Sequence, residues 1–268
     1  MIDLDAYFER IDYAGPREPT LEVLRSLQAL HPAAIPFENI DVLLGEGIDL
    51  DPAEIDAKLI GARRGGYCFE QNNLFERVLT ALGFQVEGLL GRVVWMAPPD
   101  APDPPRTHRA LKVILDGETW LADVGFGGAV LTAPLRWVMD EPQATPHEDF
   151  RLRDLGHEVL LETKLEAWTP VYRLGRDPPF PIDYEVGNWF TSTHPASKFR
   201  QTLMVAMTRP EARYALLNNR FTVRPVGGAA ERRMLDADEM QEVLGEVFGL
   251  PVSTDWRPTL EWAVEAGG

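Results

Sequence analysis

The sequence predicts an α+β fold in three successive parts. The first 83 residues carry apolar side chains at helical spacing, which indicates a helical beginning. From residue 85 the chain changes to short runs of β-type residues separated by proline and glycine, a texture typical of a barrel or a strongly curved antiparallel sheet. Beyond about residue 200, strand-like runs precede one helical segment, which indicates a small α/β end domain.

Four helices are predicted in the first part. Residues 3–30 form two amphipathic helices, because a Gly-Pro pair and a further proline interrupt the apolar pattern. A third helix is predicted over residues 51–62. The strongest pattern covers residues 68–82 and ends at a glycine, which commonly terminates helices. Cys68, the only cysteine of the chain, therefore lies at the N-terminus of a helix.

The later parts are predicted to contain short strands. In the second part the β-type runs are Val86–Leu90, Arg92–Trp95, Leu111–Leu115, Trp120–Val124, Leu152–Leu161 and Ala167–Tyr172. Residues 96–105 hold five prolines, so they form a loop that delivers the chain to His108. In the third part, strands Leu203–Met207, Arg213–Leu217 and Phe221–Arg224 precede a helix over residues 236–248.

An Asp-Gly turn at residues 116–117 predicts a β-hairpin and fixes its register. Asp-Gly is favoured at the two positive-φ positions of a type I′ turn, so the residues on either side of it pair directly. Counting back along both strands puts Ala110 opposite Asp123, with His108 two residues further on the same face. The opposite face collects the apolar residues Leu111, Val113, Leu115, Trp120, Ala122 and Val124. The register predicts a His–Asp pair, and a solvent-facing ion pair is the alternative interpretation.

The charge balance argues against polyanionic partners. The chain has 42 acidic and 26 basic residues, and its formal net charge of −16 repels nucleic acid and anionic membrane surfaces. An anionic cofactor would need a local arrangement of backbone amides and a few cations. No stretch approaches the roughly 18 consecutive apolar residues of a membrane span, and the acidic, amphipathic N-terminus is unlike a signal peptide. We expect a cytoplasmic protein.

Cys68 is a candidate nucleophile. A lone cysteine excludes an intrachain disulfide, and most free cysteines are small buried hydrophobes. The preceding Arg-Arg-Gly-Gly turn at residues 63–66 is cationic, and a helix N-terminus favours a thiolate. The alternative is that the two glycines form only an entry turn.

His108 is the candidate base for that thiol. The other four histidines lie in turn-like, polar or glycine-flanked sequence, namely at His31, His147, His157 and His194. A Cys68–His108–Asp123 triad would let the aspartate orient the histidine and stabilise an imidazolium beside a thiolate. Such triads serve transglutaminases, thiol proteases and acyltransferases, so the spacing alone does not select a reaction.

Longer motifs select one family. RGGYCFEQN at residues 64–72, preceded by IPFENIDVLLG at residues 35–45, resembles the arylamine N-acetyltransferase family. The resemblance continues through LDAYFERIDY near the N-terminus, PPRTHRAL at 104–111, LADVGFGG at 121–128 and DYEVGNWFTSTHPASKF at 183–199. It covers nearly the whole chain in order, and the family's triad falls on Cys68, His108 and Asp123.

The resemblance implies an architecture and a reaction. It implies a helical bundle over residues 1–84, a β-barrel over residues 85–190 and an α/β lid over residues 191–268, with the nucleophile in a cleft. The implied reaction is ping-pong: acetyl-CoA acetylates Cys68, CoA leaves, and an arylamine or hydrazine attacks the thioester. Acetyl-CoA is then a co-substrate, with no permanently bound cofactor and no metal. The Cys68 N–H is one candidate oxyanion donor.

The same resemblance assigns binding residues. The implied CoA-binding residues are Trp95, Thr107, Phe126, Gly127 and Gly128, and the implied substrate-binding residues are Phe37, Phe126 and Phe199. Ordinary core aromatic residues and a strand-ending glycine turn are the alternatives for these positions. Arg64 and Glu38 are expected to form a structural ion pair bracing the nucleophile's turn.

This sequence differs from the family's pattern in two respects. The chain lacks the insertion that vertebrate members carry between barrel and lid and has a short C-terminal segment, which indicates a bacterial type with an open cleft. Arg109 occupies a position that is often apolar in the family.

The alternative functions are an amide synthase of the same fold that uses a larger acyl donor, a cysteine peptidase, and a non-enzymatic binding module. We expect a monomer or a homodimer.

Overall fold

The N-terminal part of the chain is helical, as predicted. The computed structural model describes residues 2–98 and 100–267. The N-terminal helices are α1 (Leu4–Arg10), α2 (Leu21–Ala34), α3 (Ile40–Leu44), α4 (Pro52–Asp56), which continues as a π-helix over Ala57–Gly61, and α5 (Cys68–Ala81). Side-chain oxygens of Asp3 and Thr20 accept backbone N–H groups in the first turns of α1 and α2. The four predicted helices are confirmed, and α3 is additional.

A seven-stranded, nearly closed sheet follows. Its strands are β2 (Gln85–Val93), β3 (Arg106–Leu115), β4 (Glu118–Ala122), β5 (Leu135–Arg136), β6 (Phe150–Asp154), β7 (Glu158–Lys164) and β8 (Trp168–Gly175), in the order β5-β4-β3-β2-β8-β7-β6. Isolated bridges join Met139 to Leu152 and Gln143 to Phe150, so the segment after β5 approaches the far edge strand β6. The predicted barrel-like sheet is confirmed.

Two predicted strand boundaries are corrected. The run Leu152–Leu161 is not one strand, because a turn with Gly156 at φ 80° divides it between β6 and β7. The two runs predicted between residues 86 and 95 form the single strand β2, which has a register shift between Gly91 and Arg92. The apolar periodicity of the sequence did not reveal these two boundaries, because a turn and a bulge each interrupt an apolar run only briefly.

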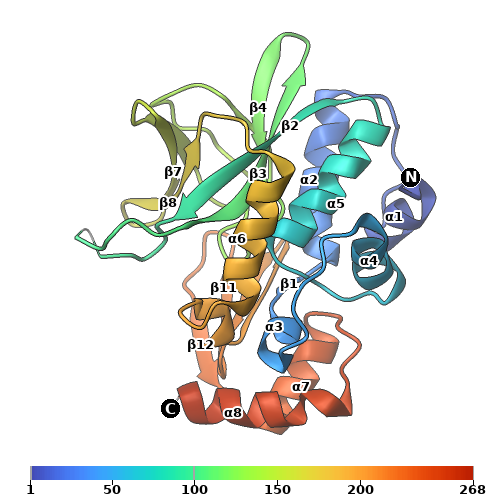
Figure 1. Cartoon of the computed structure of the whole chain (residues 1–268), viewed down its shortest axis with the longest axis vertical. Coiled ribbons are helices and arrows are strands. Elements are labelled where there is room, and N and C mark those ends of the chain that lie inside the picture. The colour runs from blue at the N-terminus through green and yellow to red at the C-terminus, as the bar shows by residue number, and fades with distance from the viewer. Residues whose placement is uncertain (1, 99, 268) are drawn as a thin grey trace.

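The hairpin of β3 and β4 has the predicted register. Asp116 and Gly117 both have positive φ, at 50° and 79°, and the pairing runs from Leu115 opposite Glu118 to Leu111 opposite Ala122. The predicted apolar face packs against α2 and α5, with Leu111, Val113, Trp120, Ala122 and Val124 buried in that core and Leu115 packed against it. Helix α5 therefore lies against β3, the strand that carries His108 (Figure 1).

A second sheet of five strands lies with the C-terminal helices. It has the order β1-β9-β10-β11-β12, with β1 (Phe37–Glu38), β9 (Met204–Arg209), β10 (Ala212–Leu217), β11 (Arg220–Pro225) and β12 (Glu231–Met234). Helices α7 (Ala237–Glu246) and α8 (Arg257–Gly267) share its core and occupy the bottom of Figure 1. Strand β1 comes from the N-terminal part, so this sheet joins the two ends of the chain.

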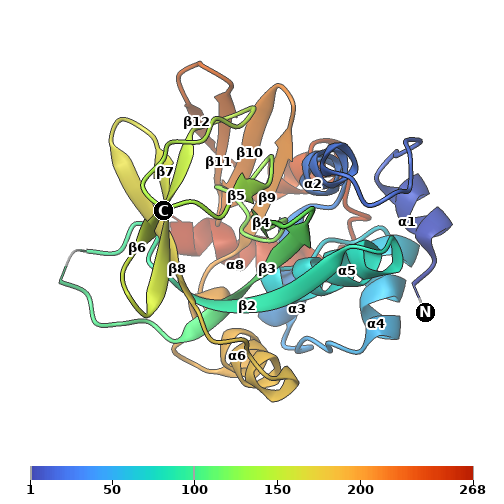
Figure 2. The ribbon, with the colours of Figure 1, turned by 90° about the horizontal axis from the view of Figure 1, so that it is seen from above.

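Helix α6 (Pro181–Thr193) was not among the predicted elements. Pro181 occupies its first turn, where the missing N–H costs nothing, and Asp183 accepts the Phe180 N–H at 2.7 Å. Seen from above, α6 lies beside β2, and it packs against β3 (Figure 2). It spans the predicted boundary at residues 190 and 191, and the division into three parts remains a prediction.

None of the helices in the described ranges combines the length and the apolar composition needed to cross a bilayer.

Candidate active site

Close backbone packing holds Cys68 at the start of α5. A Cβ atom on Gly65 would lie 2.2 Å from the Pro36 carbonyl oxygen, and one on Gly125 would lie 2.7 Å from the Cys68 Cα atom. Both positions therefore require glycine. The turn before Cys68, the segment at Pro36 and the loop at Gly125 are therefore in direct contact at the N-terminus of α5.

The Cys68 thiol is largely enclosed and faces the beginning of β3. The residue is 3% exposed, and Sγ donates a hydrogen bond to the Thr107 carbonyl oxygen at 3.4 Å. The same strand carries His108 as its next residue. Strand β3 therefore presents the Thr107 carbonyl oxygen to the thiol, and the Cys68 side chain is also one of the groups that act on the His108 imidazole.

His108 and Asp123 form a buried hydrogen-bonded pair. The His108 Nε2 atom lies 2.8 Å from Asp123 Oδ2, and the two side chains are 2% and 0% exposed. The pair that the hairpin register predicts is present, and the solvent-facing alternative is wrong. Asp123 Oδ1 accepts further hydrogen bonds from Asn72 Nδ2 at 2.8 Å and from the Gly125 N–H at 2.9 Å.

The electrostatics of this pair favour its charged form. Burial opposes the imidazolium, but the charge and hydrogen bond of Asp123, together with the Cys68 side chain, raise the pKa of His108 to about 10. Burial likewise opposes the carboxylate, yet the His108 charge and the hydrogen bonds to Oδ1 and Oδ2 hold the pKa of Asp123 below its ordinary value. At neutral pH these contacts favour the imidazolium form of His108 beside the Cys68 side chain.

Asn72 is a site residue that sequence reasoning missed. It is fully buried one helical turn after Cys68, and its Nδ2 also donates to the Arg109 carbonyl oxygen at 2.7 Å. Its Oδ1 accepts the Val124 N–H at 3.1 Å. One side chain thus ties α5 to the backbone beside both His108 and Asp123. The signal was available, because i and i+4 positions share one helix face.

Aromatic rings surround the imidazole. The Phe126 ring centroid lies 5.2 Å from that of His108, and Trp95 packs edge-on against Phe126 at 6.3 Å. Tyr172 is a buried residue of β8 that the sequence patterns did not indicate, and its ring centroid lies 4.6 Å from that of His108. The predicted residues Trp95 and Phe126 are therefore brought together on the His108 side of the site.

A second aromatic group packs around Cys68. Phe37 and Phe199 are half-buried, belong to the same apolar cluster as Cys68, and meet edge-on at 6.0 Å. Gly127 lies in the left-handed region at φ 79°, and a Cβ atom there would lie 3.2 Å from the Phe37 ring. Gly128 is exposed, and a Cβ atom there would meet open space. The predicted glycine turn therefore borders Phe37.

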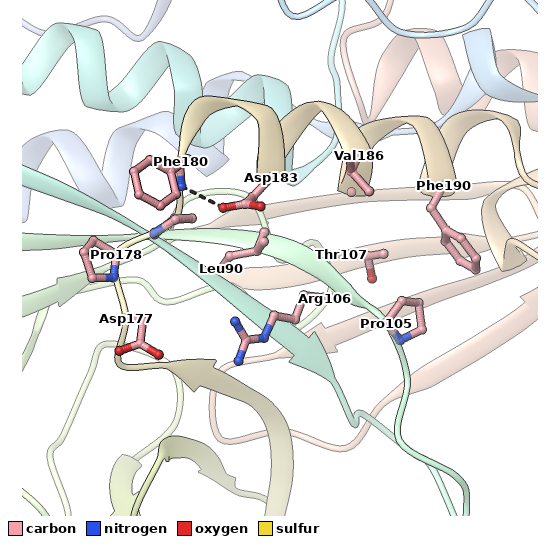
Figure 3. Close-up of a pocket in the computed structure, with 12 residues that line it drawn as sticks. Leu90, Pro105, Arg106, Thr107, Asp177, Pro178, Phe180, Asp183, Val186 and Phe190 are labelled. Atoms are coloured by element: carbon pink, nitrogen blue, oxygen red, sulfur yellow. Dashed lines mark hydrogen bonds between the residues drawn. The ribbon is translucent and has the colours of Figure 1, made fainter.

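A cavity of about 450 Å³ opens between α6 and the start of β3 (Figure 3). Its lining residues are Leu90, Pro105, Arg106, Thr107, Asp177, Pro178, Pro179, Phe180, Asp183, Val186, Gly187 and Phe190. Thr107, whose carbonyl oxygen contacts the thiol, is the predicted site residue that this cavity shares. The other predicted CoA and substrate residues lie outside its lining.

His31, Arg109 and Arg64 each have structural partners. His31 is fully buried, with hydrogen bonds to Tyr7 and Gln71, and burial lowers the pKa of His31 to about 4, so it is a satisfied core residue. Arg109 pairs with Glu76 and lies 4.2 Å from the Tyr184 ring centroid, which links β3 to α5 and α6. The predicted Arg64–Glu38 ion pair is present at 2.8 Å.

In the part of the chain that the structure describes, no three His, Cys, Asp or Glu side chains are grouped so that they could hold a metal ion.

Comparison with known proteins identifies relatives along nearly the whole chain. The family model for N-acetyltransferases matches residues 20–257. The arylamine N-acetyltransferase of Mycobacterium tuberculosis is 43% identical, covering 94% of this chain and 90% of its own length. That of Escherichia coli is 45% identical, covering 93% and 89%.

Solved structures agree with these sequence relatives. The Mycobacterium tuberculosis arylamine N-acetyltransferase superposes with a TM-score of 0.93 at 42% identity, covering 98% of this chain and 99% of that one. The Mycobacterium marinum enzyme in complex with CoA gives a TM-score of 0.93 at 42% identity, covering 98% of both chains.

Proposed function

Because this chain belongs to the arylamine N-acetyltransferase family, we propose that it carries an acetyl group from acetyl-CoA to an arylamine, arylhydrazine or hydrazine through an acetylated Cys68. Membership makes the chain an acyltransferase. The observation that carries the proposed mechanism is the buried His108–Asp123 pair beside a thiol at a helix N-terminus. The relatives' names favour this reaction over an amide synthase.

The first half-reaction consumes acetyl-CoA. The Cys68 thiolate attacks the acetyl carbonyl carbon and forms a new C–S bond. The bond from that carbon to the CoA sulfur breaks, and the His108 imidazolium gives its proton to the departing CoA thiolate. The Cys68 N–H, at a helix start without an intrahelical carbonyl partner, stabilises the transient oxyanion. The products are free CoA, acetyl-Cys68 and neutral His108.

The second half-reaction consumes the amine. Its nitrogen attacks the thioester carbonyl carbon, and neutral His108 accepts the proton that the nitrogen loses. The C–S bond to Cys68 then breaks, which restores the thiolate beside an imidazolium. Asp123 fixes the orientation of His108 throughout, because its carboxylate holds the Nε2 side of the ring.

Binding roles follow from the two aromatic groups. We assign Phe37, Phe126 and Phe199 to the aromatic ring of the acceptor, because they border Cys68 and His108. Trp95, Thr107 and Phe126 are assigned to the pantetheine arm of acetyl-CoA. Gly127 and Gly128 are assigned to its pyrophosphate, since a negatively charged protein needs backbone amides for phosphate. The CoA complex of the Mycobacterium marinum relative supports CoA as a ligand of this fold.

The setting of the enzyme is part of the proposal. An unpaired cysteine as the nucleophile is suited to a reducing compartment, so we place the enzyme in the cytoplasm, as a monomer or a homodimer that binds no nucleic acid and no membrane.

Mass spectrometry of the protein mixed with acetyl-CoA alone tests the mechanism. The peptide that contains Cys68 should gain one acetyl group, and an equivalent amount of CoA should appear before any amine is added. Adding an aniline should then remove the acetyl group and yield the acetylated aniline. If CoA appears only when the amine is also present, the transfer is direct and the acetyl-cysteine intermediate is wrong.

A further inference from the structure

Five charged side chains gather beside the N-terminal turn of α5. They are Glu38, Asp41, Lys58, Arg64 and Glu70, and we call them the charge cluster. All five are mostly shielded from solvent, so their pairing is screened less than a surface ion pair would be. The sequence motif explains only the Arg64–Glu38 contact, and the reaction described above uses none of the five.

Lys58 is the cation that reaches the nucleophile's own helix. Its Nζ lies 2.7 Å from Glu70 Oε1 and 2.7 Å from Asp41 Oδ2, and the Glu70 side chain is 2% exposed. Within the described residues no other cation pairs with Glu70. Arg64 cannot replace it in this arrangement, because its guanidinium is held by Glu38 and Asp41.

The other oxygen of Glu70 caps the helix that begins at Cys68. Glu70 Oε2 accepts the Tyr67 N–H at 3.0 Å, directly before Cys68 in the chain. A Cβ atom on Gly66 would lie 2.7 Å from the same oxygen, so the carboxylate packs tightly against the glycine turn. A continuous chain of contacts therefore runs from the Lys58 ammonium through one carboxylate to the Tyr67 N–H, directly before the nucleophile.

The carboxylate depends on its cation. Burial and the neighbouring Glu38 charge raise the pKa of Glu70, while Lys58 and the Tyr67 N–H oppose that rise. Burial also opposes the Lys58 charge, but Glu70, Glu38 and Asp41 together raise the pKa of Lys58, so it stays charged. Removing one partner of a buried ion pair leaves an uncompensated charge, which is more costly than replacing both.

We propose that Lys58 is a positioning residue: it holds the Glu70 carboxylate against the first turn of α5 and so fixes the Cys68 sulfur relative to His108. This inference rests on the proposed role of Cys68 as the nucleophile. The reactivity of Cys68 should therefore depend on Lys58 only while Glu70 carries a charge. Replacing both charges with neutral groups of similar shape should restore the turn, because the amide oxygen that Glu70→Gln introduces can still accept the Tyr67 N–H.

Four variants of the whole chain test the proposal: Lys58→Met, Lys58→Arg, Lys58→Met with Glu70→Gln, and Lys112→Met as the matched control. Lys112 of β3 pairs with Glu87 of the neighbouring strand β2 at 2.9 Å, and within the described residues it forms no ion pair with the charge cluster. The measured quantity is the rate of iodoacetamide alkylation at Cys68, followed by mass spectrometry at neutral pH. Circular dichroism and thermal unfolding of each variant show which samples are folded.

We expect Lys58→Met to slow alkylation about tenfold or more, since small displacements of a reacting group can cost up to about a hundredfold in rate. The double variant and Lys112→Met should lie within about threefold of wild type, and Lys58→Arg, which keeps the positive charge, should alkylate faster than Lys58→Met. If Lys58→Met unfolds, the double variant decides, because it lacks the same lysine and should remain folded and reactive.

Wild-type reactivity in folded Lys58→Met would overturn the proposal, and so would a double variant as slow as the single one. A merely structural lysine would lower the unfolding temperature without changing the alkylation rate of the folded protein. Alkylation is measured without acetyl-CoA or amine, so its outcome is separate from the proposed transferase reaction, which fails instead if folded Cys68→Ala still turns over.

Discussion

At the scale of single residues, the hydrogen bonds around Asp123 determine the chemistry of the site. Each carboxylate oxygen has a buried donor, and those donors come from β3, α5 and the loop after β4. The carboxylate therefore stays ionised in a buried position, and its charge keeps His108 protonated.

Cys68→Ala should reduce acetyl transfer by more than about a thousandfold while the protein stays folded, because Cys68 is the acetyl carrier in the proposed mechanism. The measurement is the initial rate of CoA release with an aniline, with circular dichroism as the folding control. In wild type, loss of activity with iodoacetamide should parallel modification of Cys68, and acetyl-CoA should protect. Full activity after complete alkylation would exclude this thiol as the carrier.

Asp123→Asn should change the pH profile of alkylation. In wild type the raised pKa of about 10 keeps His108 charged below that pH. Because an adjacent imidazolium favours the thiolate form of a cysteine, the proposed pairing predicts that alkylation remains fast well below neutral pH. Without the carboxylate, burial disfavours the imidazolium, and the rate should rise with pH as it does for an ordinary thiol. Acetylation should slow by about 10²–10⁴-fold. Identical profiles for the two folded proteins would contradict a charged His108 beside Cys68.

At the scale of elements, the site depends on close contacts between the start of α5, the loop after β4 and strand β1. Strand β1 pairs with β9 on one side and bridges Gly66 on the other, so the second sheet is joined directly to the turn before Cys68. Asn39, which follows β1, donates to the Phe199 carbonyl oxygen at 2.7 Å. Phe37 and Phe199 are therefore positioned by the same short strand.

Gly125→Ala should damage this assembly. The added methyl group would lie 2.7 Å from the Cys68 Cα atom, so the loop after β4 or the start of α5 must move. We expect a loss of about 1–3 kcal/mol in the free energy of unfolding and up to about a hundredfold in acetylation rate. Urea unfolding and single-turnover acetylation measure the two effects.

Gly245→Ala is the matched control for that substitution. Gly245 lies within α7, and the nearest atom to an added Cβ is 3.8 Å away, so alanine should leave transfer unchanged and stabilise the helix slightly. If Gly125→Ala behaves like Gly245→Ala in both measurements, the loop after β4 does not need its close approach to Cys68.

At the scale of the whole molecule, net charge sets the conditions for binding acetyl-CoA. A protein of net charge −16 repels an anionic donor at long range, and salt reduces that repulsion because the Debye length is about 10 Å at 0.1 M ionic strength. The second-order rate constant for Cys68 acetylation by acetyl-CoA should therefore increase about two- to tenfold between about 10 and 150 mM NaCl.

An uncharged acetyl thioester is the control for this effect, because its rate constant should be insensitive to salt. A rate constant for acetyl-CoA that falls with added salt would show that local cations outweigh the net charge of the molecule.

The sequence by itself determined the local features of this protein. The apolar helical pattern over residues 68–82 and the Asp-Gly turn each specify structure through contacts between residues close in the chain. The structure confirms helix α5 and the β3–β4 register. The His108–Asp123 pair follows from that register, since both residues belong to one hairpin or its immediate continuation. The long motifs indicated the family, and the comparisons confirm it.

Only the tertiary structure decided which distant segments meet. The helical pattern places Asn72 on the same face as Cys68, but its contact with Asp123 is not visible in local periodicity, and neither are the contacts of Tyr172 with His108 and of Lys58 with Glu70. Likewise, no pattern within residues 37–38 reveals that they pair with β9, a strand near the other end of the chain. Such contacts arise from burying apolar faces against one another, and that packing depends on the whole chain at once rather than on any single window of sequence.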